Sequence, residues 1–561
     1  MSSDVAMTPT STEEPTEASS SGVTTYLSLV GGETVPGEEW VYVVDSDALL
    51  DNAFATLSLK RKLERGKVSA KNLPPTIVGR VARADRATTE RALQAAAAAT
   101  GPWSRVPAEV RIDRFGELLR RRLVERSEQL TEVLVREGHP LALARWQVSG
   151  ALEVFGPESL GFYRSQMLQE FRHGDRRISV RRRPDGVVCL NPPQNAPLSS
   201  ALLGVTAIMA GNSLVVRAPR SAPLGAMYVL QEVVAPVLAE LGAPPGTLNA
   251  VCGDPAPMLN AWLDSPLVDD IMYFGSSENG IRFQERCIAA GKKPILELAG
   301  NDVVLVWKDA DLEAAADAIT ESFYGSGQLC MIPNQVVVHP DVRDRLLALL
   351  AERAARIRPG RASEEGVLLT PVLRNEKFFS CLQDALDRGA ELVCGGHAVQ
   401  EDGTRDTAGI FLEPTVVLIR GGLEKAREVQ AVREETFFPL LPVIAAEPAP
   451  DDVQLDRFVD FVNSNAYGLR NSAWAGDPEV VDAIVGRITQ GGLLKVNDSH
   501  IGFLPYLPTH GGTGLTGGAF GEANYPILRT SHVQGVSVAT GVRPTEAVFG
   551  AWQAMRAAAG D

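Results

Sequence analysis

The chain has 561 residues, of which 45% are hydrophobic and 22% charged, as is typical of a soluble globular protein with more than one domain. Its formal net charge of −15 argues against a nucleic-acid partner, because nucleic acids bind basic surfaces. No stretch approaches the roughly 18 consecutive apolar residues that a membrane span needs, so we expect no contact with a membrane.

Residues 1–22 are mainly Ser, Thr, Glu and Pro, and they lack the basic and apolar regions of a signal peptide. We therefore predict a disordered tail. The cysteines show neither CxxC nor His-rich spacing, so we expect no metal site and no disulfide framework, which favours a reducing, cytoplasmic setting. They are Cys189, Cys252, Cys287, Cys330, Cys381 and Cys394.

The first part of the chain is expected to mix strands and helices. Residues 41–83 show no single periodicity, whereas apolar residues then recur at helical spacing. Gly138, His139 and Pro140 resemble the end of a helix, so we assign His139 no chemistry. The segments predicted here are helices over 88–98, 107–137 and 141–163, and an Arg-rich hairpin over 171–183.

Between residues 186 and 300, short apolar strands alternate with helices. Such alternation predicts a parallel sheet covered by helices on both faces, the architecture that binds dinucleotides at the carboxyl ends of its strands. A second alternating unit begins at residue 303. The predicted strands are 187–190, 213–217, 248–252, 270–274 and 303–307, and the predicted helices are 201–210, 225–241, 281–290 and 312–323.

Three stretches carry groups that can do chemistry. In residues 323–334, Cys330 follows a turn rich in Gly and Ser, where an exposed thiol can act as a nucleophile. A lone cysteine is more often inert filling, so this signal is weak by itself. In residues 293–302 an apolar strand delivers Glu297 and stops at Gly300, and in residues 187–198 a strand runs into prolines around Asn195.

In this order and spacing, the three stretches resemble the aldehyde dehydrogenase superfamily from about residue 25 to about residue 540. The resemblance implies an α/β protein with a Rossmann-like NAD(P)-binding domain, an α/β catalytic domain and a small β oligomerisation segment. It further implies a homodimer or homotetramer paired through that segment. The implied domains are 23–165 with 186–299 for the cofactor, 300–500 for catalysis, 166–185 with 525–540 for bridging subunits, and a C-terminal tail over 541–561.

The resemblance also places the cofactor. Gly275 and Ser276 form a turn that opens a helix, whose free N–H groups suit a pyrophosphate. Glu435 and Phe437 match the family residues that hold the nicotinamide ribose and ring. Where the family usually carries Lys and often a ribose-binding Glu, this chain has Arg217 and Arg220. Two guanidiniums suit a 2′-phosphate, which favours NADP, although NAD stays possible if Arg220 points to solvent.

The match loosens around the expected substrate. Gln194 replaces a Trp beside the catalytic amide, and His510 replaces an aromatic residue of the substrate tunnel, where it is a candidate substrate contact or second base. Met331, next to the nucleophile, is a third candidate for the substrate pocket. The predicted edge strand 532–539 is similar to one that completes a neighbour's sheet in these oligomers. We infer an atypical pocket, more polar than the sites for fatty or aromatic aldehydes.

The chemistry implied by the resemblance is hydrolytic oxidation of an aldehyde. The Cys330 thiolate attacks the carbonyl carbon, and the Asn195 amide and the Cys330 N–H stabilise the oxyanion. Hydride passes to the nicotinamide, leaving a thioacyl-enzyme. Glu297 then activates the water that releases a carboxylic acid, a task for a partly buried carboxyl whose pKa is raised toward neutrality.

Two other functions remain open at this point. An acyl-thioester reductase of the coenzyme A type would run the covalent chemistry backwards, but Glu297 would then direct water onto the acyl-enzyme. A catalytically silent binding or scaffold subunit is compatible with the altered tunnel. The presence of Cys330, Glu297 and Asn195 together speaks against that role.

Overall fold

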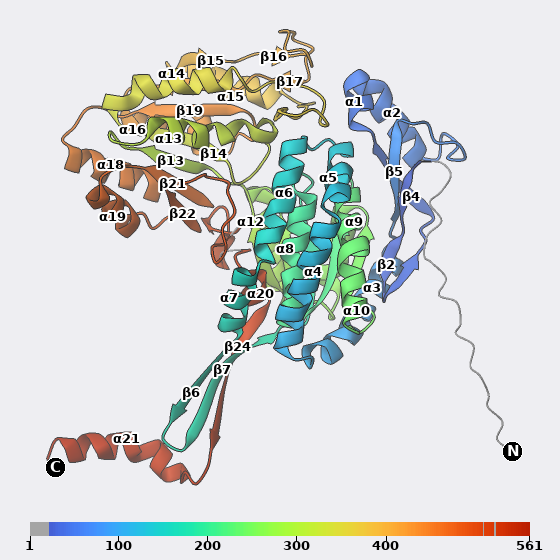
Figure 1. Ribbon diagram of the computed structural model, residues 1–561, viewed down its shortest axis with the longest axis vertical. Coiled ribbons are helices and arrows are strands. Elements are labelled where there is room, and N and C mark those ends of the chain that lie inside the picture. The colour runs from blue at the N-terminus through green and yellow to red at the C-terminus, as the bar shows by residue number, and fades with distance from the viewer. Residues whose placement is uncertain (1–21, 509, 521–522, 561) are drawn as a thin grey trace.

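Three β-sheets organise the computed structural model, which describes residues 22–508, 510–520 and 523–560 (Figure 1). Nearly all of the predicted disordered tail therefore lies outside the described residues. Two sheets form the cores of two α/β bodies, and the third forms a long arm that projects from one of them (Figure 1). Across the described part of the chain, no helix has the length and apolar character needed to cross a membrane.

The first sheet has ten strands, with the order β1-β5-β10-β9-β8-β11-β12 along its main path. Strands β8 to β12 are parallel and consist mainly of buried apolar residues, as expected for a sheet covered on both faces. The chain adds β9 and β10 on one side of β8, then β11 and β12 on the other. The strands are β1 Thr24–Tyr26, β2 Ser28–Val30, β3 Glu33–Val35, β4 Glu39–Val44, β5 Ile77–Arg83, β8 Val187–Asn191, β9 Ser213–Ala218, β10 Leu248–Cys252, β11 Asp270–Phe274 and β12 Lys293–Glu297.

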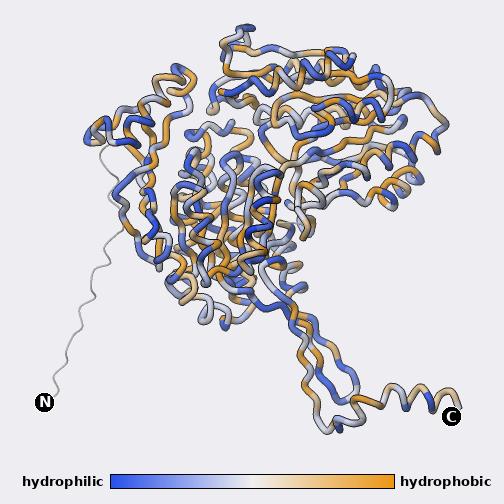
Figure 2. Tube along the Cα trace, turned by 180° about the vertical axis from the view of Figure 1, so that it is seen from behind, coloured by the Kyte–Doolittle hydropathy of each residue, from blue (hydrophilic) through white to orange (hydrophobic). Residues whose placement is uncertain are grey.

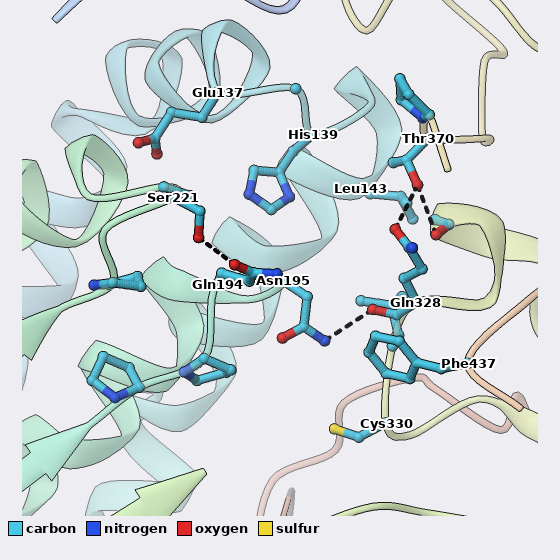
Figure 3. A pocket seen from close by; sticks show the side chains of 18 of the residues that line it. Glu137, His139, Leu143, Gln194, Asn195, Ser221, Gln328, Cys330, Thr370 and Phe437 are labelled. Atoms are coloured by element: carbon cyan, nitrogen blue, oxygen red, sulfur yellow. Dashed lines mark hydrogen bonds between the residues drawn. The ribbon is translucent and has the colours of Figure 1, made fainter. Parts of the chain in front are cut away.

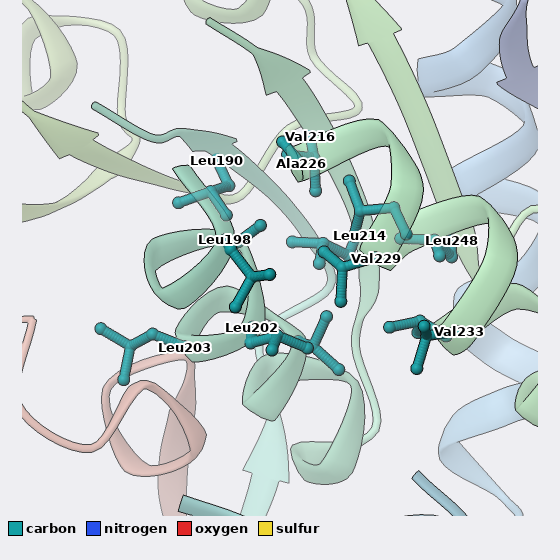
Figure 4. Packing of buried hydrophobic residues seen from close by; sticks show 14 of the residues in the cluster. Leu190, Leu198, Leu202, Leu203, Leu214, Val216, Ala226, Val229, Val233 and Leu248 are labelled. Carbon is teal, nitrogen blue, oxygen red and sulfur yellow. The ribbon is translucent and has the colours of Figure 1, made fainter. Parts of the chain in front are cut away.

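Apolar side chains from one face of the sheet and the helices that cover it form a buried cluster (Figure 4), and a second cluster lies on the other face. Helix α8 (Pro197–Ala210) is mainly apolar and, apart from Ser199, buried, because it lies between the sheet and other helices. Leu198 and Leu202 of this helix belong to the same buried cluster as Leu190 and Leu214 of strands β8 and β9. Burial of this helix fixes the segment that follows β8 and carries Asn195.

The helices of this body are more broken than the sequence predicts. The helix expected over 107–137 consists of a π-helical turn and two α-helices, and the one expected over 141–163 breaks at Gly156 and Pro157. Helices α1 and α2 were not predicted. The helical segments are α1 Ser46–Asp51, α2 Ala53–Glu64, α3 Arg86–Ser104, η1 Glu109–Arg114, α4 Phe115–Glu125, α5 Ser127–Arg136, α6 Leu141–Val154, α7 Pro157–Met167, α9 Leu224–Tyr228, η2 Val229–Val234, α10 Ala235–Glu240, α11 Pro255–Asp264 and α12 Ser277–Ala289.

The second sheet has seven strands in the order β15-β18-β19-β14-β13-β21-β22. All neighbouring pairs are parallel except β15 with β18. The strands are β13 Asp302–Val306, β14 Pro333–Val338, β15 Glu391–Cys394, β18 Thr415–Ile419, β19 Leu440–Ala445, β21 Arg470–Trp474 and β22 Leu493–Val496. The main helical segments are α13 Leu312–Ile319, η3 Thr320–Gly327, η4 Pro340–Val342, α14 Arg343–Ala354, α15 Glu376–Asp387, α16 Gly422–Ala426, α17 Gln430–Arg433, α18 Asp451–Asn463 and α19 Pro478–Arg487.

The arm is an antiparallel sheet in the order β24-β7-β6, and strand β24 pairs with β7 of its own chain. Figure 2 shows that hydrophilic and hydrophobic residues alternate along it, whereas hydrophobic chain is concentrated inside the two bodies. The C-terminal residues, expected as a tail, form helix α21 because apolar residues recur there at helical spacing. The elements are β6 Leu168–His173, β7 Arg176–Pro184, α20 Pro526–Arg529, β24 Ser531–Ala539 and α21 Pro544–Ala558.

Short elements complete the chain, and one of these pairs bears on the site. Strand β23 is part of the glycine-rich stretch that follows residue 510, and it pairs with β20. These elements are β16 Ala398–Val399, β17 Phe411–Leu412, β20 Tyr467–Gly468, β23 Thr513–Gly514 and η5 Gly518–Phe520.

Candidate active site

A cavity of about 980 Å³ lies between the two α/β bodies and has walls from both. On the side of the first sheet, the wall follows the carboxyl ends of β8, β9, β11 and β12. Strands β9 and β10 lie on one side of β8, and strands β11 and β12 lie on the other. The crevice beside β8 is therefore a topological switch point. Polar groups that follow different strands therefore converge on one space.

The nucleophile turn has an unusual backbone. Gly325, Ser326 and Gly327 all have left-handed φ angles, of 61°, 55° and 72°. A side chain at Gly327 would meet the carbonyl oxygen of Phe438 at 2.2 Å, so only glycine fits there. Ser326 is held by Thr370, whose carbonyl accepts from the Ser326 hydroxyl at 2.6 Å. This turn ends the η3 segment and brings Cys330 to the cavity wall.

Glu297 and Cys330 lie together at the cavity wall. The thiol donates a long hydrogen bond to Glu297 Oε1 at 4.0 Å, and Glu297 Oε2 accepts from the Gly511 N–H. Burial raises the pKa of Glu297 to about 8, although the Gly511 N–H opposes the shift. Burial, together with the Glu297 carboxylate, also raises the pKa of Cys330 well above its usual value. Near neutral pH, before a substrate binds, the Cys330 thiol and the Glu297 carboxyl group are therefore both mainly protonated.

The Asn195 side chain follows β8 and faces the same space as Cys330 (Figure 3). Its Nδ2 donates one hydrogen bond to the Gln328 carbonyl at 2.9 Å, and this bond fixes the orientation of the amide. An amide NH₂ group has two donors. The second N–H can therefore be given to a substrate oxygen.

Glu435 and Phe437 line the cavity on the side of the second body. Glu435 Oε1 accepts from the Gly300 N–H at 3.0 Å, and burial raises its pKa to about 8. Phe437 has a left-handed φ of 63°, which is uncommon for a residue other than glycine. That these two residues hold the nicotinamide half of a cofactor stays a prediction.

Gly275 and Ser276 also line the cavity, at the carboxyl end of β11. The Ser276 hydroxyl caps helix α12 by accepting from the Asn279 N–H at 3.4 Å. A helix N-terminus carries a partial positive charge and free N–H groups, which suit a pyrophosphate.

The two guanidiniums that favoured NADP are already occupied by protein groups. Arg217 is 5% exposed, and its Nε donates to Asn191 Oδ1 at 2.6 Å. Arg220 pairs with Asp254 and, at 3.1 Å, with Glu64 of helix α2. Both guanidiniums lie in the cavity wall, and neighbouring acceptors in the folded chain fix their orientation.

Of the three residues expected in the substrate pocket, only Gln194 is part of the cavity wall, where it accepts from the Ser221 hydroxyl (Figure 3). Met331 is 4% exposed and packs in a cluster with Leu329 and Ile501, so its expected position needs correction. His510 is also outside the wall. Its ring lies 6.0 Å from that of Phe274, and burial lowers its pKa to about 3, which disfavours a role as a charged contact.

Sequence reasoning missed several wall residues. His139 points into the cavity (Figure 3), where burial lowers its pKa to about 4 and keeps it neutral. Gln147 lies 3.5 Å from His139 Nδ1. Thr370 anchors the nucleophile turn and lies 3.4 Å from Gln328 Oε1. No local pattern marks these residues, because separate loops and helices bring them together only in the folded chain.

Comparison with known proteins shows to which family the chain belongs. The sequence pattern of the aldehyde dehydrogenase family matches residues 67–530. The chain belongs to the aldehyde dehydrogenase family. This confirms the resemblance, the α/β fold class and the prediction of an NAD(P)-dependent oxidoreductase that acts on aldehydes. Among the described residues, no group of three or more His, Cys, Asp or Glu side chains could hold a metal ion.

Individual relatives share about a quarter to a third of their residues with this aldehyde dehydrogenase. It is 30% identical to a 3-sulfolactaldehyde dehydrogenase from Pseudomonas putida, in an alignment that covers 71% of this chain and 79% of that protein. It is 27% identical to the succinate-semialdehyde dehydrogenase [NADP(+)] of Escherichia coli K12, in an alignment that covers 75% of this chain and 84% of that protein. A crystal structure of an NAD-dependent aldehyde dehydrogenase from Sinorhizobium meliloti superposes with a TM-score of 0.77 at 25% identity, covering 94% of this chain and 98% of that one.

Proposed function

We propose that this protein oxidises an aldehyde to a carboxylic acid through a covalent intermediate on Cys330, which water activated by Glu297 then hydrolyses. The observation that carries the proposal is the pairing of the Cys330 thiol with Glu297 Oε1 at 4.0 Å on the wall of the cavity. A thiol nucleophile and a carboxyl group with a pKa of about 8 are the two groups that this chemistry needs.

The first step is attack of Cys330 sulfur on the aldehyde carbon. The thiol proton goes to Glu297, which is close enough to receive it, and a sulfur–carbon bond forms as the carbonyl π bond breaks. Negative charge then develops on the former carbonyl oxygen. We assign the second N–H of Asn195 and the backbone N–H of Cys330 as the donors to that oxygen, since the bond to Gln328 uses only one N–H of the amide.

The second step requires a hydride acceptor, and the cavity residues fit NAD or NADP. The wall includes Arg220 and Ser276 at the ends of β9 and β11, and Glu435 and Phe437 near Cys330, so one elongated ligand can reach both regions. When bound, the nicotinamide accepts the hydride from the thiohemiacetal carbon. Glu435 and Phe437 would orient that end, and Ser276 and the N-terminus of α12 would bind the phosphates.

The third step is hydrolysis of the thioester. Glu297 first releases to solvent the proton that it took from the thiol. Its carboxylate then accepts a proton from water as the water oxygen attacks the acyl carbon. The carbon–sulfur bond breaks to give the acid, and the leaving thiolate takes the proton back from Glu297. Burial raises the pKa of Glu297 to about 8, so the basic form increases as the pH rises toward that value. We expect the rate of hydrolysis to rise with pH in the same range.

The substrate we favour is a small polar or anionic aldehyde. His139, Gln147 and Gln194 give the cavity uncharged polar groups where a site for fatty aldehydes would be apolar. The relatives support this choice, because their names include 3-sulfolactaldehyde, succinate-semialdehyde and glutarate-semialdehyde dehydrogenases. The proximity of Glu297 to Cys330 disfavours a thioester reductase, whose acyl-enzyme must avoid water.

The test is cofactor reduction by purified protein with a panel of anionic, amino, aromatic and small neutral aldehydes, with NAD and NADP in parallel. We expect turnover with at least one anionic aldehyde and none with Cys330→Ser, which keeps a polar side chain but lacks the thiol. Turnover that survives in Cys330→Ser would contradict the covalent route. Absence of turnover across the panel despite cofactor binding would favour the thioester reductase.

A further inference from the structure

Helix α2 places an ammonium group in the wall of the cavity, beside Arg220. We infer that Lys60 and Arg220 bind the 2′-phosphate of NADP, and that helix α2 thereby makes the protein prefer NADP over NAD. This inference rests on the proposed function, because it assumes that the cavity holds the dinucleotide. It assigns a role in cofactor choice to a segment for which the sequence predicted neither helix nor function.

The Lys60 ammonium has donors that the described residues leave open. Its side chain is 18% exposed, and its ion-pair partner among those residues is Glu64, whose Oε1 is 3.8 Å away. That distance is too long for a hydrogen bond, and the described part of the chain offers the ammonium no other acceptor within bonding distance. Burial also lowers the pKa of Lys60. A largely buried ammonium with open donors is stabilised by an anion.

Glu64 holds the two cations side by side. One of its oxygens faces Lys60, and the other accepts from the Arg220 guanidinium at 3.1 Å. Lys60 and Arg220 are both part of the cavity wall, whereas Glu64 and Asp254 are not. The carboxylates thus fix the cations from behind, and the positive groups face the space where a ligand binds.

Glu137 also lines this end of the cavity, where its two oxygens accept from the Leu224 and Gly225 N–H groups and burial raises its pKa to about 7. Arg83 and Arg220 share Asp254, Arg83 also pairs with Glu39, and Glu64 lies between Lys60 and Arg220. Arg217 adds a further positive charge, yet it bonds only to neutral acceptors, namely Asn191 and the carbonyl groups of Ala218 and Gly253. A phosphate dianion can accept hydrogen bonds from Lys60 and Arg220 at the same time, but a neutral ribose hydroxyl cannot replace those charge-assisted bonds.

The fold separates this phosphate site from that of the pyrophosphate. Gly275 and helix α12 follow strand β11, while Arg220 follows β9, and β8 lies between these strands. Neighbouring strands lie about 5 Å apart, so the two sites are about 10 Å apart along the sheet edge. A cofactor with its pyrophosphate at α12 can extend its adenosine half toward Lys60.

Calorimetric titration with two nucleotides, which report binding without turnover, tests the inference. Adenosine 2′,5′-bisphosphate carries the phosphate that distinguishes NADP, and adenosine 5′-monophosphate lacks it. We expect the wild type to bind the bisphosphate at least about tenfold more tightly, and Lys60→Met to weaken that binding about 10- to 100-fold. Binding of the monophosphate should change less than about twofold, which also shows that the variant is folded.

Lys62→Met is the matched control, because Lys62 lies on the same helix but is exposed and outside the wall. It should leave both affinities unchanged, and Lys60→Arg should retain most of the preference. Equal weakening of both nucleotides in Lys60→Met would place Lys60 at the shared phosphate and overturn the inference. Equal affinity of the wild type for both would also overturn it. Absence of binding of either nucleotide would instead contradict the proposed cofactor cavity.

Discussion

At one end of the cavity, burial raises the pKa values of Glu297 and Glu435 to about 8, whereas at the other end Lys60 and Arg220 lie against Glu64. Desolvation disfavours the charged form of any group, but Lys60 and Arg220 at the second end have carboxylate partners within 4 Å. The first end therefore suits groups that gain and lose protons. The second suits groups that stay charged and bind an anion.

The strongest test of the proton-handling end is Glu297→Gln, which keeps the shape of the side chain but cannot accept a proton. We expect steady-state turnover to fall about 10²- to 10⁴-fold, because hydrolysis loses its base. If the thiol can still lose its proton to solvent, one equivalent of reduced cofactor should form rapidly in stopped-flow measurements. Wild-type turnover in this variant would remove Glu297 from the mechanism.

Asn195→Ala tests oxyanion stabilisation in the same region. Loss of one preorganised donor should lower kcat by about 10²- to 10³-fold, because the donor acts only when charge develops on the substrate oxygen. Cofactor affinity, measured by titration, should be unchanged, since the amide bonds to Gln328 and not to the phosphate sites. A defect confined to KM would contradict this role.

Gly327→Ala sharpens the comparison by testing the backbone that presents Cys330. The new methyl group would lie 2.2 Å from the Phe438 oxygen, so we expect a loss of about 2–4 kcal/mol in the free energy of unfolding. Gly366→Ala is the matched control, because Gly366 has a φ of 77° but open space around it. That variant should lose about 1 kcal/mol in chemical denaturation. Equal losses would contradict the steric argument.

The raised pKa of Glu297 also makes the stability of the protein depend on pH. Glu297 keeps its proton up to about pH 8 in the folded protein, compared with about pH 4.5 in the unfolded chain. The folded state thus binds more protons between these values, so rising pH lowers its stability. From pH 5 to pH 9 the wild type should lose about 4 kcal/mol relative to Glu297→Gln. A constant difference in denaturation experiments would contradict the raised pKa.

The sequence predicts an element or a site residue best when it depends on one continuous segment of the chain. Strands such as 248–252 and 270–274 were predicted with the bounds that the structure has, because their β-branched and apolar residues form a fully buried parallel sheet. Cys330, Glu297 and Asn195 each follow a recognisable local pattern. All three lie on the cavity wall, although their catalytic roles remain predictions.

The rest depends on contacts between distant segments. Helix α2 buries only Thr56 and Leu63, so its apolar periodicity is weak and the sequence did not indicate it. The positions of Lys60 and His139 in the wall depend on how separate elements pack. The bond between Arg217 and Asn191 could not be predicted from the sequence either, because it joins two neighbouring strands. Pairing of subunits through the arm stays a prediction.

The most direct test of the central claim is intact-mass spectrometry of Glu297→Gln after mixing with a turnover-supporting aldehyde and NADP. We predict a mass increase equal to the acyl group, located on Cys330 by peptide mapping and absent from Cys330→Ser. The adduct should accumulate only in the presence of cofactor, because hydride transfer must precede formation of the stable thioester. Stoichiometric cofactor reduction with no adduct on Cys330 would contradict covalent catalysis by this residue.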